Sequence, residues 1–155
     1  MCAVARFLYF AALTLWVGGL WIVGFYAAPA VFAVLKDDHV LAGEITSHFF
    51  AAIGWIGIVT APCLLAFKVV VSRPRGDALR QARFWIIVVM LALALIEQFY
   101  MQPMMAEIKA QALPLPVMKS ALAGRFDFWH RATEIMYTIV SLLGAWLVYL
   151  ETRSR

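Results

Sequence analysis

The chain has 155 residues, of which 65% are apolar and 14% are charged, and its net charge is +4. Soluble domains are typically about 45–50% apolar, and a chain this short has too little interior to bury so much apolar surface. The composition therefore excludes an ordinary soluble domain, a disordered chain and a disulfide scaffold. It predicts an integral membrane protein with a single domain over residues 1–155.

Four segments are apolar enough to cross a hydrocarbon core of roughly 30 Å as helices, which takes about 20 residues each. They cover residues 7–35, 45–71, 84–103 and 129–150. We therefore expect an all-α bundle of four transmembrane helices. The third helix is expected to continue past Pro103 and to break at Leu-Pro-Leu-Pro, because each proline disfavours helix in the residue before it. The segment after this break predicts a short interfacial helix in the second outer loop.

The distribution of Lys and Arg predicts the orientation of the bundle. The side that holds both termini and the loop between the second and third spans carries eight of these residues, and the other side carries five. By the positive-inside rule, both termini are expected to be cytoplasmic, in a multi-pass protein of the bacterial inner membrane. The basic loop Arg73–Arg83 is expected to lie against anionic headgroups. It is too short to predict a nucleic-acid partner.

Polar side chains gather near the outer ends of the spans. Glu97 lies near the end of the third span, and His130 and Glu134 lie at the start of the fourth. His48 begins the second span, and Tyr26 lies near the end of the first. Because a charged group at mid-membrane costs at least about 2.5 kcal/mol, we expect these five side chains to meet in one outer-leaflet binding site. The cytoplasmic half is expected to hold no comparable cluster.

Helical spacing predicts which faces pack. On the fourth span one stripe is expected to face the bundle, and it contains His130, Glu134, Tyr137, Thr138, Ser141 and Ala145. Small residues four apart allow close contact between helices, and the candidate pairs are Thr14/Gly18, Gly24/Ala28 and Gly57/Ala61. The Thr14/Gly18 face is also a candidate contact for a homo-oligomer.

Three interpretations of the outer cluster are open. It fixes helix packing in an assembly or scaffold subunit, or it binds a small solute or metal cation, or it holds haem between His48 and His130. A transition metal would use imidazole, carboxylate and thioether ligands, here His130, Glu134, Glu97, Met101 and Met104. No catalytic motif is recognisable, so we assign no catalytic residue. The leading hypothesis is a non-enzymatic protein that binds or moves a small solute or metal cation.

Four sequence blocks carry a resemblance to a known family. In chain order they read WVGGLWIVGFYAAPAVFAVL, AGEITSHFF, IEQFYMQPMM and FDFWHRATEIMY. The chain resembles the domain of unknown function 4149 family, which includes the transmembrane protein 205-like proteins. This resemblance implies a four-helix membrane protein with no established reaction, and the link of animal members to platinum-drug resistance favours metal binding or export. The family often carries His-Gly-x-Ser and a later Asn around His130, whereas this chain has His130-Arg131-Ala132-Thr133 and no Asn.

A weaker likeness connects the chain to copper-resistance membrane proteins and to the membrane-bound protoporphyrinogen oxidases. It rests on the Trp-x-Gly-Gly block that begins at Trp16 and on the proline and phenylalanine after it. The oxidases would require a histidine one to two turns before Trp16, and this chain has Tyr9 there. The sequence therefore lacks the ligand on which an oxidase activity would depend.

Overall fold

The computed structural model describes residues 3–72 and 81–153. In chain order its elements are α1 (Ala3–Ile22), the π-helix η1 (Val23–Ala27), α2 (Ala28–Val34), α3 (His39–Ser72), α4 (Ala82–Ile96), the π-helix η3 (Glu97–Met101), α5 (Gln102–Ala112), the 3-10 turn η4 (Val117–Lys119) and α6 (Ala123–Thr152). The described residues contain no strand. They form four rods long and apolar enough to cross a membrane, namely α1–η1–α2, α3, α4–η3–α5 and α6. The predicted four-helix class is confirmed.

The helices extend beyond the apolar segments predicted from the sequence. α3 has 34 residues and is therefore about 51 Å long, against roughly 30 Å of hydrocarbon. The third rod continues past Pro103 to Ala112 and ends before the Leu-Pro-Leu-Pro segment, as expected. The expected interfacial helix is shorter than predicted, because only Val117–Lys119 forms a 3-10 turn before α6 begins. Most of the basic loop Arg73–Arg83 lies outside the described residues.

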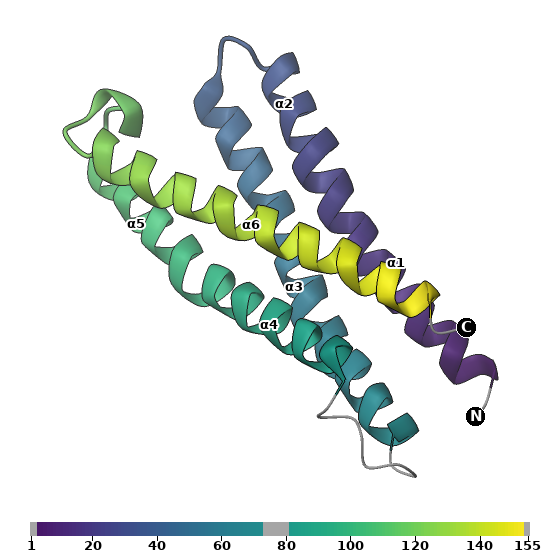
Figure 1. Cartoon of the computed structure of the whole chain (residues 1–155). Helices are drawn as coiled ribbons and strands as arrows, with labels where there is room; N and C mark the ends of the chain where they lie inside the picture. Colours follow the sequence, from purple (N-terminus) through teal and green to yellow (C-terminus); the bar gives the residue numbers. More distant parts are fainter. Residues whose placement is uncertain (1–2, 73–80, 154–155) are drawn as a thin grey trace.

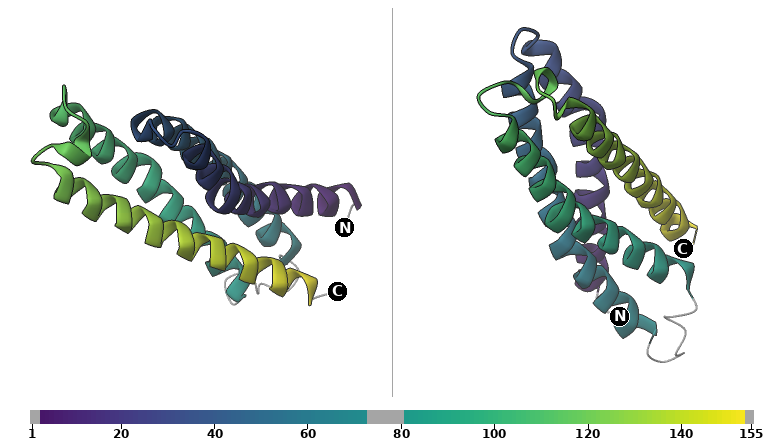
Figure 2. Two further views of the ribbon diagram at one scale, coloured as in Figure 1. Left: turned by 90° about the horizontal axis from the view of Figure 1, so that it is seen from above. Right: turned by 90° about the vertical axis from the view of Figure 1, so that its left-hand side faces the viewer.

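The four rods form a closed ring of neighbours, in which α1 packs on α3, α3 on α4, α4 on α6, and α6 on α1. The start of α1, the end of α3, the start of α4 and the end of α6 lie together, and we call this the termini side of the bundle (Figures 1 and 2). The opposite end, with the α2–α3 and α5–α6 connections, is the loop side. Here the α2–α3 and α5–α6 hairpins diverge, as Figure 1 shows. The bundle is therefore tighter toward the termini side.

A layer of buried apolar side chains fills the bundle toward the termini side. Every rod contributes at least one side chain that is at most 2% exposed: Leu13, Trp16, Leu64, Ile87, Met90 and Leu147. Trp16 fits against α3 because Gly57 has no side chain, and a Cβ there would lie 2.5 Å from the indole Nε1. This layer separates the polar groups described below on the loop side from those on the termini side.

The small residues predicted for helix packing divide into two groups. Four of them lie at helix contacts or are buried, namely Gly24, Ala28, Gly57 and Ala61. Thr14 is exposed, and a Cβ added at Gly18 would have no neighbouring atom within 4 Å. There is thus room beside Gly18 and the Thr14 side chain is exposed, and the role of both residues in a homo-oligomer stays a prediction.

Candidate functional site

The structure turns one of the five predicted outer residues partly into the bundle. Glu97, the first residue of η3, is half-buried. The other four side chains are exposed, namely Tyr26, His48, His130 and Glu134. In the described part of the chain, no group of three or more His, Cys, Asp or Glu residues lies close enough to hold a metal ion.

The stripe predicted for the inner face of α6 is wrong at His130, Glu134 and Thr138, whose side chains are exposed. The buried residues of α6 are Tyr137, Val140, Ser141, Gly144, Leu147 and Glu151. With Ser141 set beside Val140, the remaining five residues follow one another in steps of three and four that average 3.5, which keeps a straight seam against the neighbouring helices. One turn before Tyr137, Thr133 continues this seam, whereas the side chains of His130 and Glu134 are exposed. Thr133 is half-buried, and its hydroxyl lies 3.9 Å from the sulfurs of Met101 and Met105.

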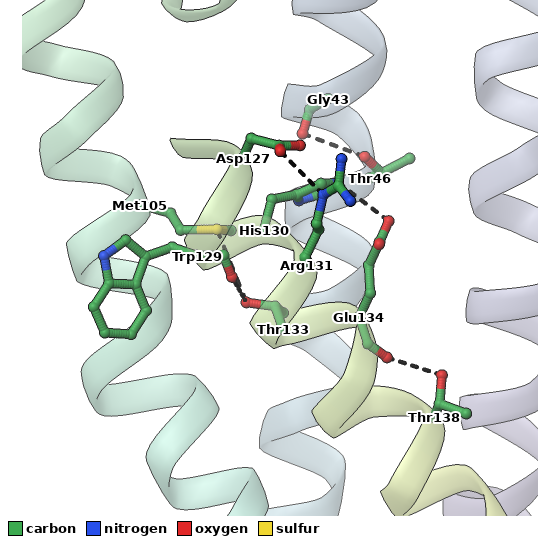
Figure 3. Close-up of polar contacts among 10 residues, drawn as sticks. All are labelled: Gly43, Thr46, Met105, Asp127, Trp129, His130, Arg131, Thr133, Glu134 and Thr138. Atoms are coloured by element: carbon green, nitrogen blue, oxygen red, sulfur yellow. Dashed lines mark hydrogen bonds and ion pairs between the residues drawn. The ribbon is translucent and has the colours of Figure 1, made fainter. Parts of the chain in front are cut away.

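His130 and Glu134 form a contact on the outer surface of α6 (Figure 3). His130 Nε2 lies 3.4 Å from Glu134 Oε1, and the two side chains are 50% and 65% exposed. Arg131 Nε donates to Asp127 Oδ2 at 3.0 Å one turn away, so Arg131 pairs with Asp127 and not with a buried carboxylate. An exposed pair of this kind contributes little to stability. The side chains of Asp127, His130, Arg131 and Glu134 therefore lie on the surface of α6 and do not enclose a ligand.

The haem interpretation requires His48 and His130 to face each other across a cofactor. His48 is on α3 and His130 is on α6, and both side chains are exposed. α3 and α6 both pack mainly on α1 and α4, and their own contacts run through Phe50–Tyr137 and Lys68–Glu151, which involve neither histidine. The arrangement does not favour a haem held between these two histidines.

Glu97 has the most unusual environment of the predicted site residues. Its Oε1 atom is buried and has no hydrogen-bond partner among the described residues. The carboxyl group is close enough to Tyr137 on α6 to interact with it electrostatically. The next residue, Gln98, reaches across to α3, where a Cβ at Gly54 would lie 2.7 Å from its Oε1. Glu97 thus lies where residues of α3, η3 and α6 approach one another.

Tyr137 explains the π-helix η1. Its hydroxyl donates to the Leu20 carbonyl oxygen at 2.5 Å. In an α-helix, that carbonyl would accept a hydrogen bond from the Gly24 N–H. The phenol therefore inserts into the hydrogen-bond ladder of the first rod, which is a known cause of a local π-segment. Gly24 is required here because a Cβ would lie 2.3 Å from Tyr137 Cε1.

A second π-helix lies at the matching place in the third rod. η1 and η3 each contain Phe-Tyr and end two residues before a proline, in the sequences FYAAP and FYMQP. In both, the residue after the π-segment donates its N–H five residues back, from Ala28 to Val23 and from Gln102 to Glu97. Sequence reasoning missed this correspondence, although the repeated Phe-Tyr-x-x-Pro pattern was a visible signal for it.

A buried charged cluster lies on the termini side, so the expectation that this half holds none is wrong. Tyr9 on α1 donates its hydroxyl proton to Glu151 Oε1 on α6 at 2.9 Å. Lys68 Nζ on α3 donates to the same oxygen and lies 4.9 Å from the centroid of the Tyr9 ring. All three residues are at most 8% exposed. The sequence concealed this cluster because Lys68 and Glu151 stand at the edges of apolar segments, where they resemble ordinary flanking charges.

Comparison with known proteins gives one match. Residues 11–114 match the family model described as domain of unknown function (DUF4149). The matched segment includes both π-helices and Glu97, and it ends before α6 and His130. No curated protein and no solved structure matches the chain.

Proposed function

We propose that this chain, which belongs to the domain of unknown function 4149 family, binds and moves a small cationic solute at Glu97. The observation that carries this proposal is the buried Oε1 atom of Glu97, which has no hydrogen-bond partner among the described residues. An ionisable side chain inside a membrane span is costly and usually marks a substrate or ion site. A cation at this oxygen would supply the missing partner.

The backbone at this level also favours a binding site. Short π-segments in membrane and soluble helices occur frequently at functional sites. In transporters built from repeats, interrupted helices at corresponding positions of the two halves point to the substrate site. Here η1 and η3 are such a pair, and Glu97 is the acidic residue that starts one of them. The halves differ at this point, since the corresponding residue of η1 is Val23.

The direction from which a solute reaches Glu97 is limited by the buried apolar side chains, which fill the bundle toward the termini side. We therefore propose that the solute reaches Glu97 from the loop side. With both termini cytoplasmic in a bacterial inner membrane, as the Lys and Arg distribution predicts, the loop side is external.

The test compares Glu97→Gln with Glu134→Gln, which neutralises an exposed carboxylate on the loop side. We would measure thermal unfolding of the full chain in detergent with ammonium, methylammonium, potassium or zinc chloride replacing choline chloride at constant ionic strength. We expect at least one cation to raise the melting temperature of the wild type and of Glu134→Gln but not of Glu97→Gln. Uptake of labelled methylammonium into proteoliposomes, measured on the same variants, tests whether the solute moves.

Two results would refute this proposal. One is a wild-type protein whose unfolding responds to none of these cations, and the other is a Glu97→Gln variant that responds as the wild type does. If Glu97→Gln instead lowers the melting temperature equally in every salt, Glu97 serves helix packing, and the scaffold alternative is supported.

A further inference from the structure

The Tyr9–Lys68–Glu151 cluster has no part in binding at Glu97, yet it contains the elements of a cation site. We propose that Glu151 is a second cation site on the same path, on the termini side, and that the Lys68 ammonium occupies it as a tethered cation in this closed conformation. The inference rests on the proposed function, and it narrows the solute to a monovalent cation of ammonium type.

The chemistry around Lys68 Nζ matches the recognition of an ammonium group. One carboxylate oxygen of Glu151 accepts a charge-assisted hydrogen bond from Nζ, and the Tyr9 ring lies 4.9 Å away on another side. A carboxylate combined with an aromatic face is a typical environment for a bound ammonium ion. The Tyr9 ring is held in place by its hydroxyl bond to Glu151 and by stacking on Phe67 at a centroid distance of 4.6 Å. The site therefore exists independently of the lysine that fills it.

Lys68 is suited to leave this site. Its ammonium is a compact charge on a flexible four-carbon stem, so it can withdraw while the carboxylate stays on α6. Arg83 at the start of α4 also acts electrostatically on Lys68 and on Tyr9. The positive charge of Arg83 repels the Lys68 ammonium and so weakens the net electrostatic attraction that keeps Lys68 beside Glu151. A buried ion pair is in any case weak support for stability, because desolvation offsets much of its attraction.

The cluster also lies on the seam of α6 that leads from the Glu97 level. Tyr137, Ser141 and Glu151 are the polar members of the buried face of α6. Ser141 is 1% exposed, and its hydroxyl oxygen has no partner among the described residues. The apolar layer separates Ser141 from Glu151, so passage requires this layer to open. A cation that arrives at Glu151 displaces the Lys68 ammonium and thereby breaks the link between α3 and α6.

The site favours a monovalent cation over a divalent metal. Lys68 Nζ contacts one carboxylate and one aromatic ring, and no group of three or more metal-binding side chains is present among the described residues. Exchange of the Lys68 ammonium for another monovalent cation would leave the charge at this position unchanged.

The test is made in a Glu97→Gln background, so that binding at Glu97 does not contribute. The full chain is unfolded thermally in detergent with ammonium or potassium chloride replacing choline chloride at constant ionic strength. Glu97→Gln alone should not respond, because Lys68 fills the site. Adding Lys68→Met should create a response of about 3–6 °C at a cation concentration ten times the dissociation constant. A further Glu151→Gln substitution should abolish it.

Lys68→Arg is the matched control, since it keeps a tethered cation and should leave unfolding independent of the salt. A folded Lys68→Met variant that unfolds at the same temperature in all salts overturns the proposal. If Lys68→Met does not fold in choline, recovery of folded protein in ammonium or potassium chloride supports the proposal. Lys68→Gln provides the same readout with a side chain that can still donate to Glu151. If neither neutral variant folds in any salt, no free cation replaces the ammonium and the proposal is refuted.

These results are separable from those for Glu97. A protein that responds at Glu97 but shows no cation dependence after Lys68→Met retains the proposed function and loses only the second site. If the wild type shows no cation-dependent stabilisation at Glu97, but the Lys68→Met variant is stabilised by ammonium or potassium, only the second site is retained.

Discussion

Replacing Gly24 by alanine tests how Tyr137 enters the first rod. A Cβ at this position would lie 2.3 Å from Tyr137 Cε1 and 3.1 Å from Cζ, whereas carbon atoms prefer separations of about 3.5–4.0 Å. The ring cannot easily retreat, because its hydroxyl bonds to Leu20 O at 2.5 Å and the residue is 7% exposed. Overpacking of this kind costs about 1–3 kcal/mol, and the higher helix propensity of alanine offsets at most about 1 kcal/mol.

The matched control is Gly18→Ala, where an added Cβ has no neighbour within 4 Å. This variant should be as stable as the wild type or up to about 1 kcal/mol more stable. We would measure the free energy of unfolding in mixed micelles by denaturant titration followed by circular dichroism. The expected difference between the two variants is about 1–3 kcal/mol, or about 2–12 °C in melting temperature for a chain of this size.

A suppressor separates the steric cause from other effects of the substitution. Tyr137→Leu removes the aromatic ring, so Gly24→Ala should cost less in that background than in the wild type. Equal stability of Gly24→Ala and Gly18→Ala would refute the reasoning. So would an undiminished cost of Gly24→Ala when Tyr137 is leucine.

Three further predictions use the same unfolding assay. Tyr137→Phe should lower the free energy of unfolding by about 0.6–1.7 kcal/mol, which are the average and the maximum measured for hydrogen bonds between membrane helices. An unchanged free energy of unfolding would show that the hydroxyl does not stabilise η1. Gly57→Ala should destabilise the bundle by about 1–3 kcal/mol, because the added Cβ meets the Trp16 indole at 2.5–3.0 Å; a neutral result would contradict the packing of Trp16. In choline chloride, Lys68→Met should cost about 3–5 kcal/mol and the double variant Lys68→Met/Glu151→Leu much less, since the single change removes the ammonium from a buried carboxylate and leaves the carboxylate in place. Equal costs would argue against a buried pair.

The class of the protein and the number of its spans follow from local properties of the sequence. Four apolar runs of 20 or more residues in a 155-residue chain permit few alternatives, because backbone groups in lipid must bond within their own helix. The end of the third rod was also readable, since the Leu-Pro-Leu-Pro segment cannot continue a helix. Both conclusions depend on local properties of the chain, which no distant contact overrides.

Which polar groups are buried depends on contacts between helices that are far apart in the sequence. A helix presents polar residues on several faces, and neighbouring helices select among them: Tyr137 and Ser141 face inward, while His130 and Glu134 do not. The π-helix η1 depends on a hydroxyl 117 residues away, and the charged cluster joins Tyr9 to Glu151 across 142 residues. Such contacts depend on the crossing angle between two rods and on the rotation of each rod about its axis. Helical periodicity within one span determines neither the angle nor the rotation.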